Sequence, residues 1–182
     1  RDKRDDEKME AFNDRTKRID FPYVLEYTEE ANIYRKLLDG ADVPSINVEP
    51  HTLEMAGLFA VLTRLEDVDT DVDMVAKAKA YDAGAANADT LDVEKLREEA
   101  AEKADIGEGM SGISARFVGD EIAEGIVNTL NRGDDHLSPL MLFEHFEENM
   151  DGHGSIDDEY LDDYHQRLEL VREEYQSRAI ED

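Results

Sequence analysis

Apolar residues recur at intervals of three and four along most of this chain, which is the pattern of helices that bury one face. We expect helices at about 28–38, 50–65, 72–81, 91–104, 114–130, 138–150 and 156–180. Thr28 is placed as the N-cap of the first of these helices. The helix at 50–65 is apolar on nearly every side, so it should be the buried centre of the fold. The fold class predicted from this pattern is all-α.

Two segments depart from the simple helical pattern. Residues 19–25 are short, aromatic and β-branched, which predicts an extended segment, although Pro22 is incompatible with a central strand. The last helix carries a seam with heptad spacing, formed by Leu161, Tyr164, Leu168, Val171 and Tyr175. This seam covers about two heptads, fewer than the ~3–4 that indicate a coiled coil. We therefore expect a long docked helix or a stalk between domains.

The amino-acid composition excludes some classes of binding partner. The chain has 47 acidic and 20 basic residues and a formal net charge of −27, which repels nucleic acid and anionic membranes. The acidic residues are dispersed and lysines are few, as is typical of proteins from a salt-rich cytoplasm. There is no cysteine, no apolar run long enough for a transmembrane helix, and no initiating Met or signal region. We expect a piece of a longer cytoplasmic protein.

The start of the helix at 114–130 holds the first candidate for chemistry. It lies in the stretch Gly-Met-Ser-Gly-Ile-Ser-Ala-Arg-Phe at 109–117. Ser114 is a good N-cap, and Ile113 and Val118 are spaced as a hydrophobic staple. Arg116 then falls in the first turn, where the helix dipole disfavours a cation by roughly 0.3–1 kcal/mol. A bound phosphate would resolve this conflict, and so would a simple ion pair with Asp120.

Three segments of the chain, in the same order, resemble the PrkA family of serine protein kinases. They are the stretch at 109–117, the Phe-Pro-Tyr-Val-Leu and Thr-Glu-Glu-x-x-Ile-Tyr-x-Lys-Leu stretches at 21–37, and the Pro-His-Thr-Leu to Leu-Thr-Arg-Leu helix at 50–65. The resemblance runs from about residue 13 to residue 175. Proteins of this family have an AAA+ ATPase core followed by a kinase-like C-terminal region.

The resemblance implies an AAA+ lid-like helical bundle and roles for three residues. Arg116, with Ser114 beside it, would be the sensor-2 arginine that binds the nucleotide phosphates from the same subunit. The family has proline where this chain has Ala115, which removes a preference for a helix start but no side-chain chemistry. Arg15, in Asn-Asp-Arg at 13–15, would be the catalytic arginine finger that reaches a neighbouring subunit's nucleotide. The alternative for Arg15 is an ordinary solvated charge.

The resemblance also implies how the chain is divided into parts and what each part does. Residues 1–22 would end the AAA+ core, 23–134 would form the lid, and 135–182 would connect to a C-terminal region. The chain has neither a Gly-x-x-x-x-Gly-Lys-Ser/Thr loop nor kinase catalytic motifs. ATP and Mg²⁺ would therefore bind to the full-length parent and not to this part, which should be inactive by itself. Its partners would be the rest of its own polypeptide, other copies in a homo-oligomer, and an unidentified protein substrate.

Metal binding is not expected from local spacing. The acidic run at 67–73 resembles a calcium loop, but Val72 replaces its glycine and Ala78 its last ligand. The histidines at 136, 145, 153 and 165 lack a short-range ligand pair. The rival to the AAA+ interpretation is a non-enzymatic helical interaction or regulatory module, which would use the seam between Leu161 and Tyr175.

Overall fold

The computed structural model describes residues 21–41, 44–67, 72–84, 91–103, 107–154 and 156–181. Seven α-helices dominate these ranges, so the all-α prediction is confirmed. The helices are α2 (Tyr27–Gly40), α3 (Thr52–Leu62), α4 (Met74–Ala83), α5 (Val93–Lys103), α6 (Ala115–Arg132), α7 (Pro139–Met150) and α8 (Leu161–Glu181). The remaining elements are the parallel strands β1 (Asn47–Val48) and β2 (His136–Leu137) and a 3₁₀ turn, η2 (Asp158–Tyr160).

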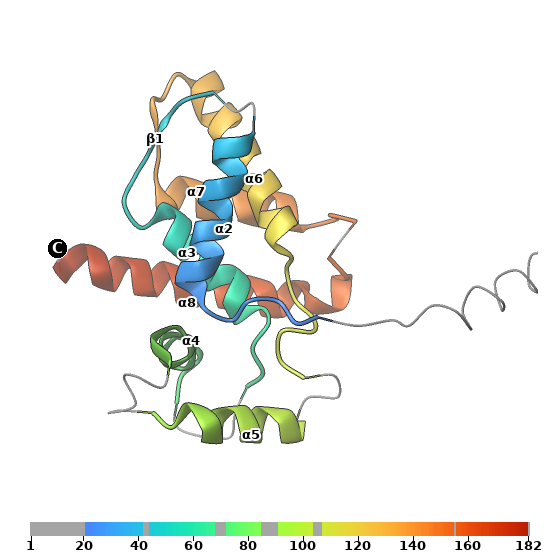
Figure 1. Ribbon diagram of the computed structural model, residues 1–182. Coiled ribbons are helices and arrows are strands. Elements are labelled where there is room, and N and C mark those ends of the chain that lie inside the picture. Colours follow the sequence, from blue (N-terminus) through green and yellow to red (C-terminus); the bar gives the residue numbers. More distant parts are fainter. Residues whose placement is uncertain are drawn as a thin grey trace, which may run out of the picture.

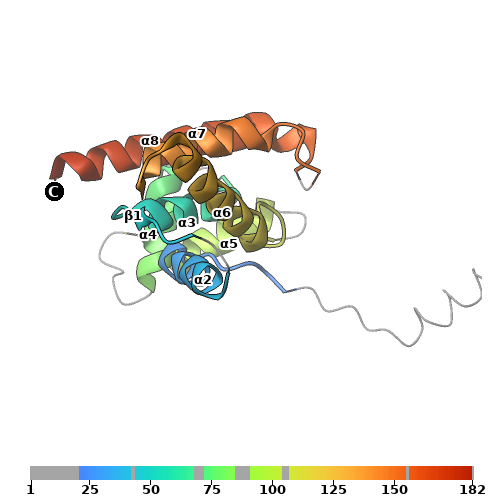
Figure 2. The same cartoon turned by 90° about the horizontal axis from the view of Figure 1, so that it is seen from above.

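Helix α3 is the centre of the molecule, as its apolar sequence predicts. Nine of its 11 residues are buried. It packs against α2, α4, α6, α7 and α8, which surround it in Figures 1 and 2. In Figure 1, α4 and α5 lie on one side of α3, and α2, α6 and α7 extend on the other. One hydrophobic core therefore includes residues from Tyr27 to Val171.

The prediction that Thr28 is the N-cap of α2 is wrong. The helix begins at Tyr27, one residue before Thr28, and its N-cap residue Glu26 makes no side-chain cap. Asp82 of α4 takes this role from a distance. Its Oδ1 accepts hydrogen bonds from the backbone N–H of Thr28 at 2.8 Å and from the Thr28 hydroxyl at 2.9 Å. A cap supplied by another helix satisfies the same backbone group but leaves no local sequence pattern.

The long C-terminal helix is docked on the core. Three of its seam residues, Tyr164, Leu168 and Val171, are buried. Helix α8 packs on α3 and α7, and its C-terminal end extends past them in Figure 2. The helix begins at Leu161 rather than near residue 156, because the 3₁₀ turn η2 precedes it. The docked-helix alternative is confirmed, and the seam faces the core of its own chain.

Residues 21–26 form neither helix nor strand, and they run beside the loop at 107–114. The two short strands pair Asn47 with His136 and Val48 with Leu137. In the described part of the chain, no helix combines the length and the apolar character that a membrane span requires.

Candidate functional site

The loop before α6 and the first turn of α6 form the candidate site that the sequence singles out. Ser114 is the N-cap of α6, and its Oγ accepts a hydrogen bond from the Phe117 N–H at 3.2 Å. Ile113 and Val118, the predicted staple, are both buried. The predicted N-cap is therefore confirmed, whereas the staple contact and the binding role of Ser114 stay predictions.

Two glycines let this loop lie against the rest of the protein. Gly109 has φ +78° and Gly112 has φ +101°, a region that side chains rarely adopt. A Cβ at Gly112 would lie 2.6 Å from the Thr63 carbonyl oxygen, and one at Gly109 would lie 3.0 Å from the Tyr23 carbonyl oxygen. The glycines are thus required both for the backbone conformation and for close packing.

Backbone hydrogen bonds fix the loop to two other segments. The Tyr23 N–H donates to the Gly109 carbonyl at 2.7 Å, and the Gly109 N–H donates to the Arg64 carbonyl at 3.0 Å. The Ile113 N–H donates to Thr63 Oγ1 at 3.0 Å. The loop is therefore held between the segment at 21–26 and the end of α3.

A buried arginine lies where these segments meet. The Arg64 side chain is fully buried and pairs with Glu30 of α2, at 2.6 Å between Nη2 and Oε1. Its Nε and Nη2 donate to the Ile113 carbonyl at 3.0 and 2.8 Å, and its Nη1 donates to the Val24 carbonyl at 2.8 Å. The guanidinium carbon also lies 4.8 Å from the centre of the Tyr23 ring. We call Tyr23, Val24, Glu30, Arg64 and Ile113 the Arg64 joint.

Tyr34 completes the polar contacts of the joint. Its hydroxyl donates to Glu30 Oε1 at 2.9 Å. Burial, and next the charge of Glu30, raises the pKa of Tyr34 well above its usual value. The hydroxyl therefore stays protonated and remains a donor to the carboxylate.

A second buried ion pair lies next to the joint. The Lys77 ammonium of α4 is fully buried, pairs with Glu108, and donates to the Glu66 carbonyl at 2.7 Å. The Tyr81 hydroxyl donates to Glu108 Oε2 at 2.8 Å. Burial, then this hydrogen bond and the charge of Glu108, raises the pKa of Tyr81 well above its usual value. Arg97 of α5 stacks over the Tyr81 ring at 5.1 Å. The loop is thus held from α4 as well as from α3.

Arg116 has a different environment. Its side chain is 91% exposed, and its Nε lies 3.8 Å from Oδ2 of the exposed Asp120. It borders an apolar groove of about 460 Å³ between α2 and α6, to which Leu37 and Gly119 also contribute. The guanidinium is therefore accessible from outside the chain, because an exposed pair at this distance contributes about 0–1 kcal/mol and does not fix it. Arg15 lies outside the described residues.

Family comparisons identify both halves of the chain. The description "PrkA AAA domain" applies to residues 1–71, and "PrkA serine protein kinase C-terminal domain" applies to residues 75–182. The chain belongs to the PrkA family. The expected resemblance is confirmed, and Arg116 falls within the C-terminal-domain match of this PrkA chain. Our division at residues 22 and 134 stays a prediction.

The curated relatives are much longer than this PrkA chain. It is 32% identical over 174 residues to the ATP-dependent protease PrkA of Bacillus subtilis (strain 168), a match that covers 94% of the chain and 26% of that relative. It is 35% identical over 114 residues to the serine/threonine kinase YeaG of Escherichia coli (strain K12), covering 63% and 17% respectively. The chain therefore spans about a quarter of the first relative's length. No solved structure matches it.

The two PrkA matches meet inside one packed body. Arg64 and Tyr23 belong to the AAA match, whereas the Ile113 and Gly109 that they contact belong to the C-terminal match. Lys77, also in the C-terminal match, donates to Glu66 in the AAA match. The contacts around the loop therefore join the two regions of the chain that match the two PrkA family descriptions.

Sequence reasoning found the segments that these contacts join but not their buried charges. All three resembling stretches converge on the Arg64 joint, yet Arg64 and Glu30 were not singled out. A signal was present, since Arg64 follows a nearly continuous apolar helix and Lys77 lies among alanines. A cation in an otherwise apolar run indicates a buried pair once the partner segment is known.

Proposed function

We propose that this chain is the lid and connector of a PrkA-type AAA+ protein. The lid closes over ATP and Mg²⁺ bound by a core outside the chain, and the connector relays the nucleotide state to the C-terminal region. In this proposal Arg116, with Ser114 at the start of its helix, binds the terminal phosphates in the same subunit. Arg15 acts as an arginine finger toward the neighbouring subunit of a homo-oligomer.

The observation that carries the proposal is an exposed cation on a rigidly anchored helix start. Arg116 is 91% exposed, but the loop that leads to it is fixed by the fully buried Arg64. A group that must meet a phosphate made available by another domain needs both properties, since it must be accessible and must already be positioned when the phosphate arrives.

The contacts between the two matched regions support the relay. Because residues of both matches share one hydrophobic core, a displacement of the AAA part displaces the first turn of α6 with it. Interiors at crystal-like packing density transmit such displacements because they have few voids to absorb them. The seam on α8, on which the rival interaction-module interpretation depended, is largely buried in the chain's own core.

For the reaction of the parent we propose serine phosphorylation of a protein, in line with the description of the C-terminal family match. The Bacillus subtilis relative bears the name of an ATP-dependent protease. Assays of the parent should therefore follow both phosphate transfer to a protein and peptide-bond cleavage. Cleavage without transfer would overturn the kinase assignment and leave the lid assignment intact.

The test of Arg116 is ATP turnover by the full-length parent. Arg116→Ala should lower turnover at least about tenfold, equivalent to roughly 1.4 kcal/mol of barrier. Arg116→Lys should restore it only in part, because an ammonium lacks the planar fork that grips two phosphate oxygens. Arg132→Ala, an exposed arginine at the other end of α6, is the matched control and should leave turnover unchanged. Normal turnover in Arg116→Ala would leave only the ion pair with Asp120.

Arg15 is distinguished from Arg116 by mixing subunits. An Arg15→Ala parent mixed with a phosphate-loop variant should recover part of the activity, because each mixed interface can combine an intact finger with an intact nucleotide site. An Arg116→Ala parent mixed in the same way should recover none, since sensor and nucleotide lie in one subunit. Equal recovery for both would contradict the assignment of the two arginines.

A further inference from the structure

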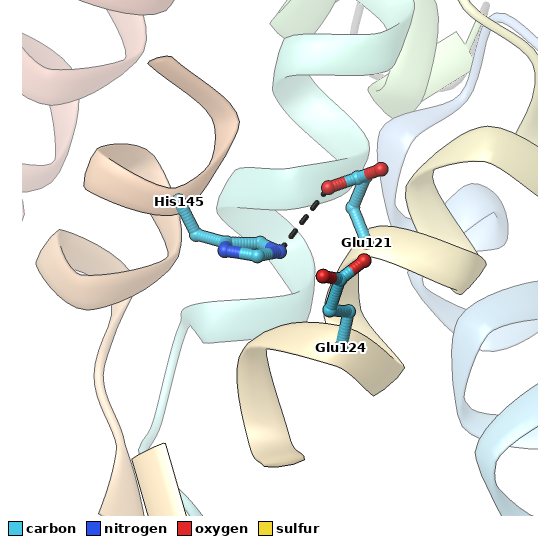
Figure 3. A group of neighbouring side chains, drawn as sticks. All are labelled: Glu121, Glu124 and His145. Carbon is cyan, nitrogen blue, oxygen red and sulfur yellow. Dashed lines mark ion pairs between the residues drawn. The ribbon is translucent and has the colours of Figure 1, made fainter. Parts of the chain in front are cut away.

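Two helices bring three potential metal ligands together on the side of α6 that packs against α7. Glu121 and Glu124 lie one turn apart on α6, and His145 comes from α7 (Figure 3). One ligand atom from each residue lies within 4.8 Å of the other two. The side chains of Glu121 and His145 are 7% and 8% exposed, whereas Glu124 is exposed. The group is thus mostly buried, with one member at the surface.

The inner carboxylate is not satisfied by its neighbours. Oε2 of Glu121 is buried and accepts no hydrogen bond. His145 Nε2 lies 3.1 Å away, but this contact lacks the geometry of a hydrogen bond. Leaving a buried acceptor unpaired costs about 1–3 kcal/mol, and more for a charged group. The contact is an ion pair when the His145 ring is protonated (Figure 3). With a neutral ring, the arrangement lacks a positive partner that both atoms could face.

We propose that Glu121, Glu124 and His145 bind a divalent first-row transition-metal ion, for which Zn²⁺ is the best fit. Imidazole nitrogen with carboxylate oxygens is a donor set that Zn²⁺ accepts, whereas Mg²⁺ and Ca²⁺ prefer oxygen alone. Tetrahedral bonds of about 2.0–2.2 Å place neighbouring ligand atoms roughly 3.3–3.6 Å apart. The 3.1 Å between Glu121 and His145 is close to this spacing, and the exposed Glu124 is free to turn inward.

Asn149 is the neighbour that orients the imidazole. Its Nδ2 donates to the His145 carbonyl at 2.8 Å and lies 3.0 Å from His145 Nδ1. A neutral ring that binds metal through Nε2 carries its proton on Nδ1 and needs an acceptor there. Metal binding through Nε2 therefore requires the Asn149 amide to move away from Nδ1, so that another acceptor or water can take the proton there.

Three protein ligands leave a fourth position open for water or an outside group. The bound ion would fix α6 to α7 about one to two turns beyond Arg116. Spacing along the sequence missed this site because its ligands come from two helices, with 20 residues between Glu124 and His145.

The test is calorimetric titration of the full chain with Zn²⁺ in molar NaCl and excess Ca²⁺, which occupy the acidic surface. We expect one equivalent of Zn²⁺ to bind and to raise the melting temperature. Glu124→Gln should weaken binding at least about tenfold without changing the metal-free melting temperature, because this side chain is exposed. His145→Gln should abolish binding. The matched controls are Glu144→Gln, which changes an exposed glutamate of α7, and His165→Gln, which removes a partly exposed His–Asp pair. Both variants should bind Zn²⁺ as tightly as the unmodified chain.

A folding defect in His145→Gln would not obscure the answer, because Glu124→Gln tests the same site from the surface. Co²⁺ provides a second measurement, since its visible absorption should show nitrogen ligation in the unmodified chain and in His165→Gln but not in His145→Gln. Absence of one-equivalent binding, or unchanged affinity in Glu124→Gln, would overturn the proposal and leave Glu121 and His145 as a plain buried ion pair.

Discussion

Replacing Arg64 by methionine should destabilise the chain far more than replacing any exposed arginine. Methionine keeps the apolar stem but removes the four hydrogen bonds that the guanidinium donates to Glu30, Val24 and Ile113. Breaking a buried ion pair by removing one partner costs about 3–5 kcal/mol. Each carbonyl left without a donor adds up to about 1–3 kcal/mol. Protonation of Glu30 and entry of water reduce this sum, so we expect a loss of at least about 4 kcal/mol.

The measurement is equilibrium unfolding by urea in molar NaCl, followed by circular dichroism. For a chain of this length a loss of 4 kcal/mol lowers the melting temperature by roughly 8–16 °C. Arg116→Met is the matched control, because it makes the same chemical change at a 91% exposed side chain. It should alter the unfolding free energy by no more than about 0.5 kcal/mol.

The double variant Glu30→Met with Arg64→Met separates charge from backbone anchoring. Removing both members eliminates the unpaired charge, and a buried pair replaced by apolar residues is often neutral or better. The Val24 and Ile113 carbonyls still lose their donor, so the double variant should lie between Arg64→Met and the unmodified chain. A double variant as stable as the unmodified chain would refute the anchoring role. A loss below about 1 kcal/mol in Arg64→Met would refute the energetic reasoning altogether.

Three further predictions concern other parts of the fold. Gly112→Ala should lower the unfolding free energy by about 2 kcal/mol or more, because φ is +101° and a Cβ would lie 2.6 Å from the Thr63 carbonyl oxygen. Urea unfolding measures this loss. The control is Gly154→Ala, since a Cβ at Gly154 would have no atom within 4 Å. Burial alone would raise the pKa of Glu174, but hydrogen bonds from Lys79 and Arg178 lower it on balance. The contribution of Glu174 to stability is therefore present above about pH 4.5 and is lost as pH falls through the lowered pKa. The difference in unfolding free energy between the unmodified chain and Glu174→Gln should shrink as the pH falls below about 4.5. A constant difference would contradict the lowered pKa. The net charge of −27 predicts a melting temperature that rises from dilute to molar NaCl as the screening length falls to ~3 Å, and a flat response would count against a salt-rich origin.

The accuracy of the sequence predictions follows from the range of the interactions involved. Helix α3, the cap at Ser114 and the docked seam of α8 were predictable because periodicity and capping are local. The cap of α2 was not, since Asp82 lies 54 positions from Thr28. The buried pairs and the ligand cluster between α6 and α7 were also missed, because each joins residues that become neighbours only after the helices pack.

The distribution of buried cations explains how the two PrkA matches are held together. The last carbonyls of any helix lack partners within it and carry partial negative charge. In α3 this end is buried. Arg167 of α8 donates to the carbonyl of Leu62, the last residue of the helix, at 2.6 Å, and to that of Leu65, in the segment after it, at 3.3 Å. Lys77 of α4 donates to the carbonyl of Glu66, in the segment that follows α3. The end of α3 belongs to the AAA match, and both cations belong to the C-terminal match.

Arg64 completes this arrangement in the opposite direction, because it leaves the end of α3 and donates to the carbonyl that precedes the cap of α6. An acidic chain with only 20 basic residues thus places three buried cations around one helix end. Separating the two matched parts would expose unpaired carbonyls on one side and leave buried charges without partners on the other, at about 1–3 kcal/mol for each unsatisfied group. Any movement of α3 would therefore carry α4, α6 and α8 with it, which is the coupling that the proposed relay through Arg116 requires.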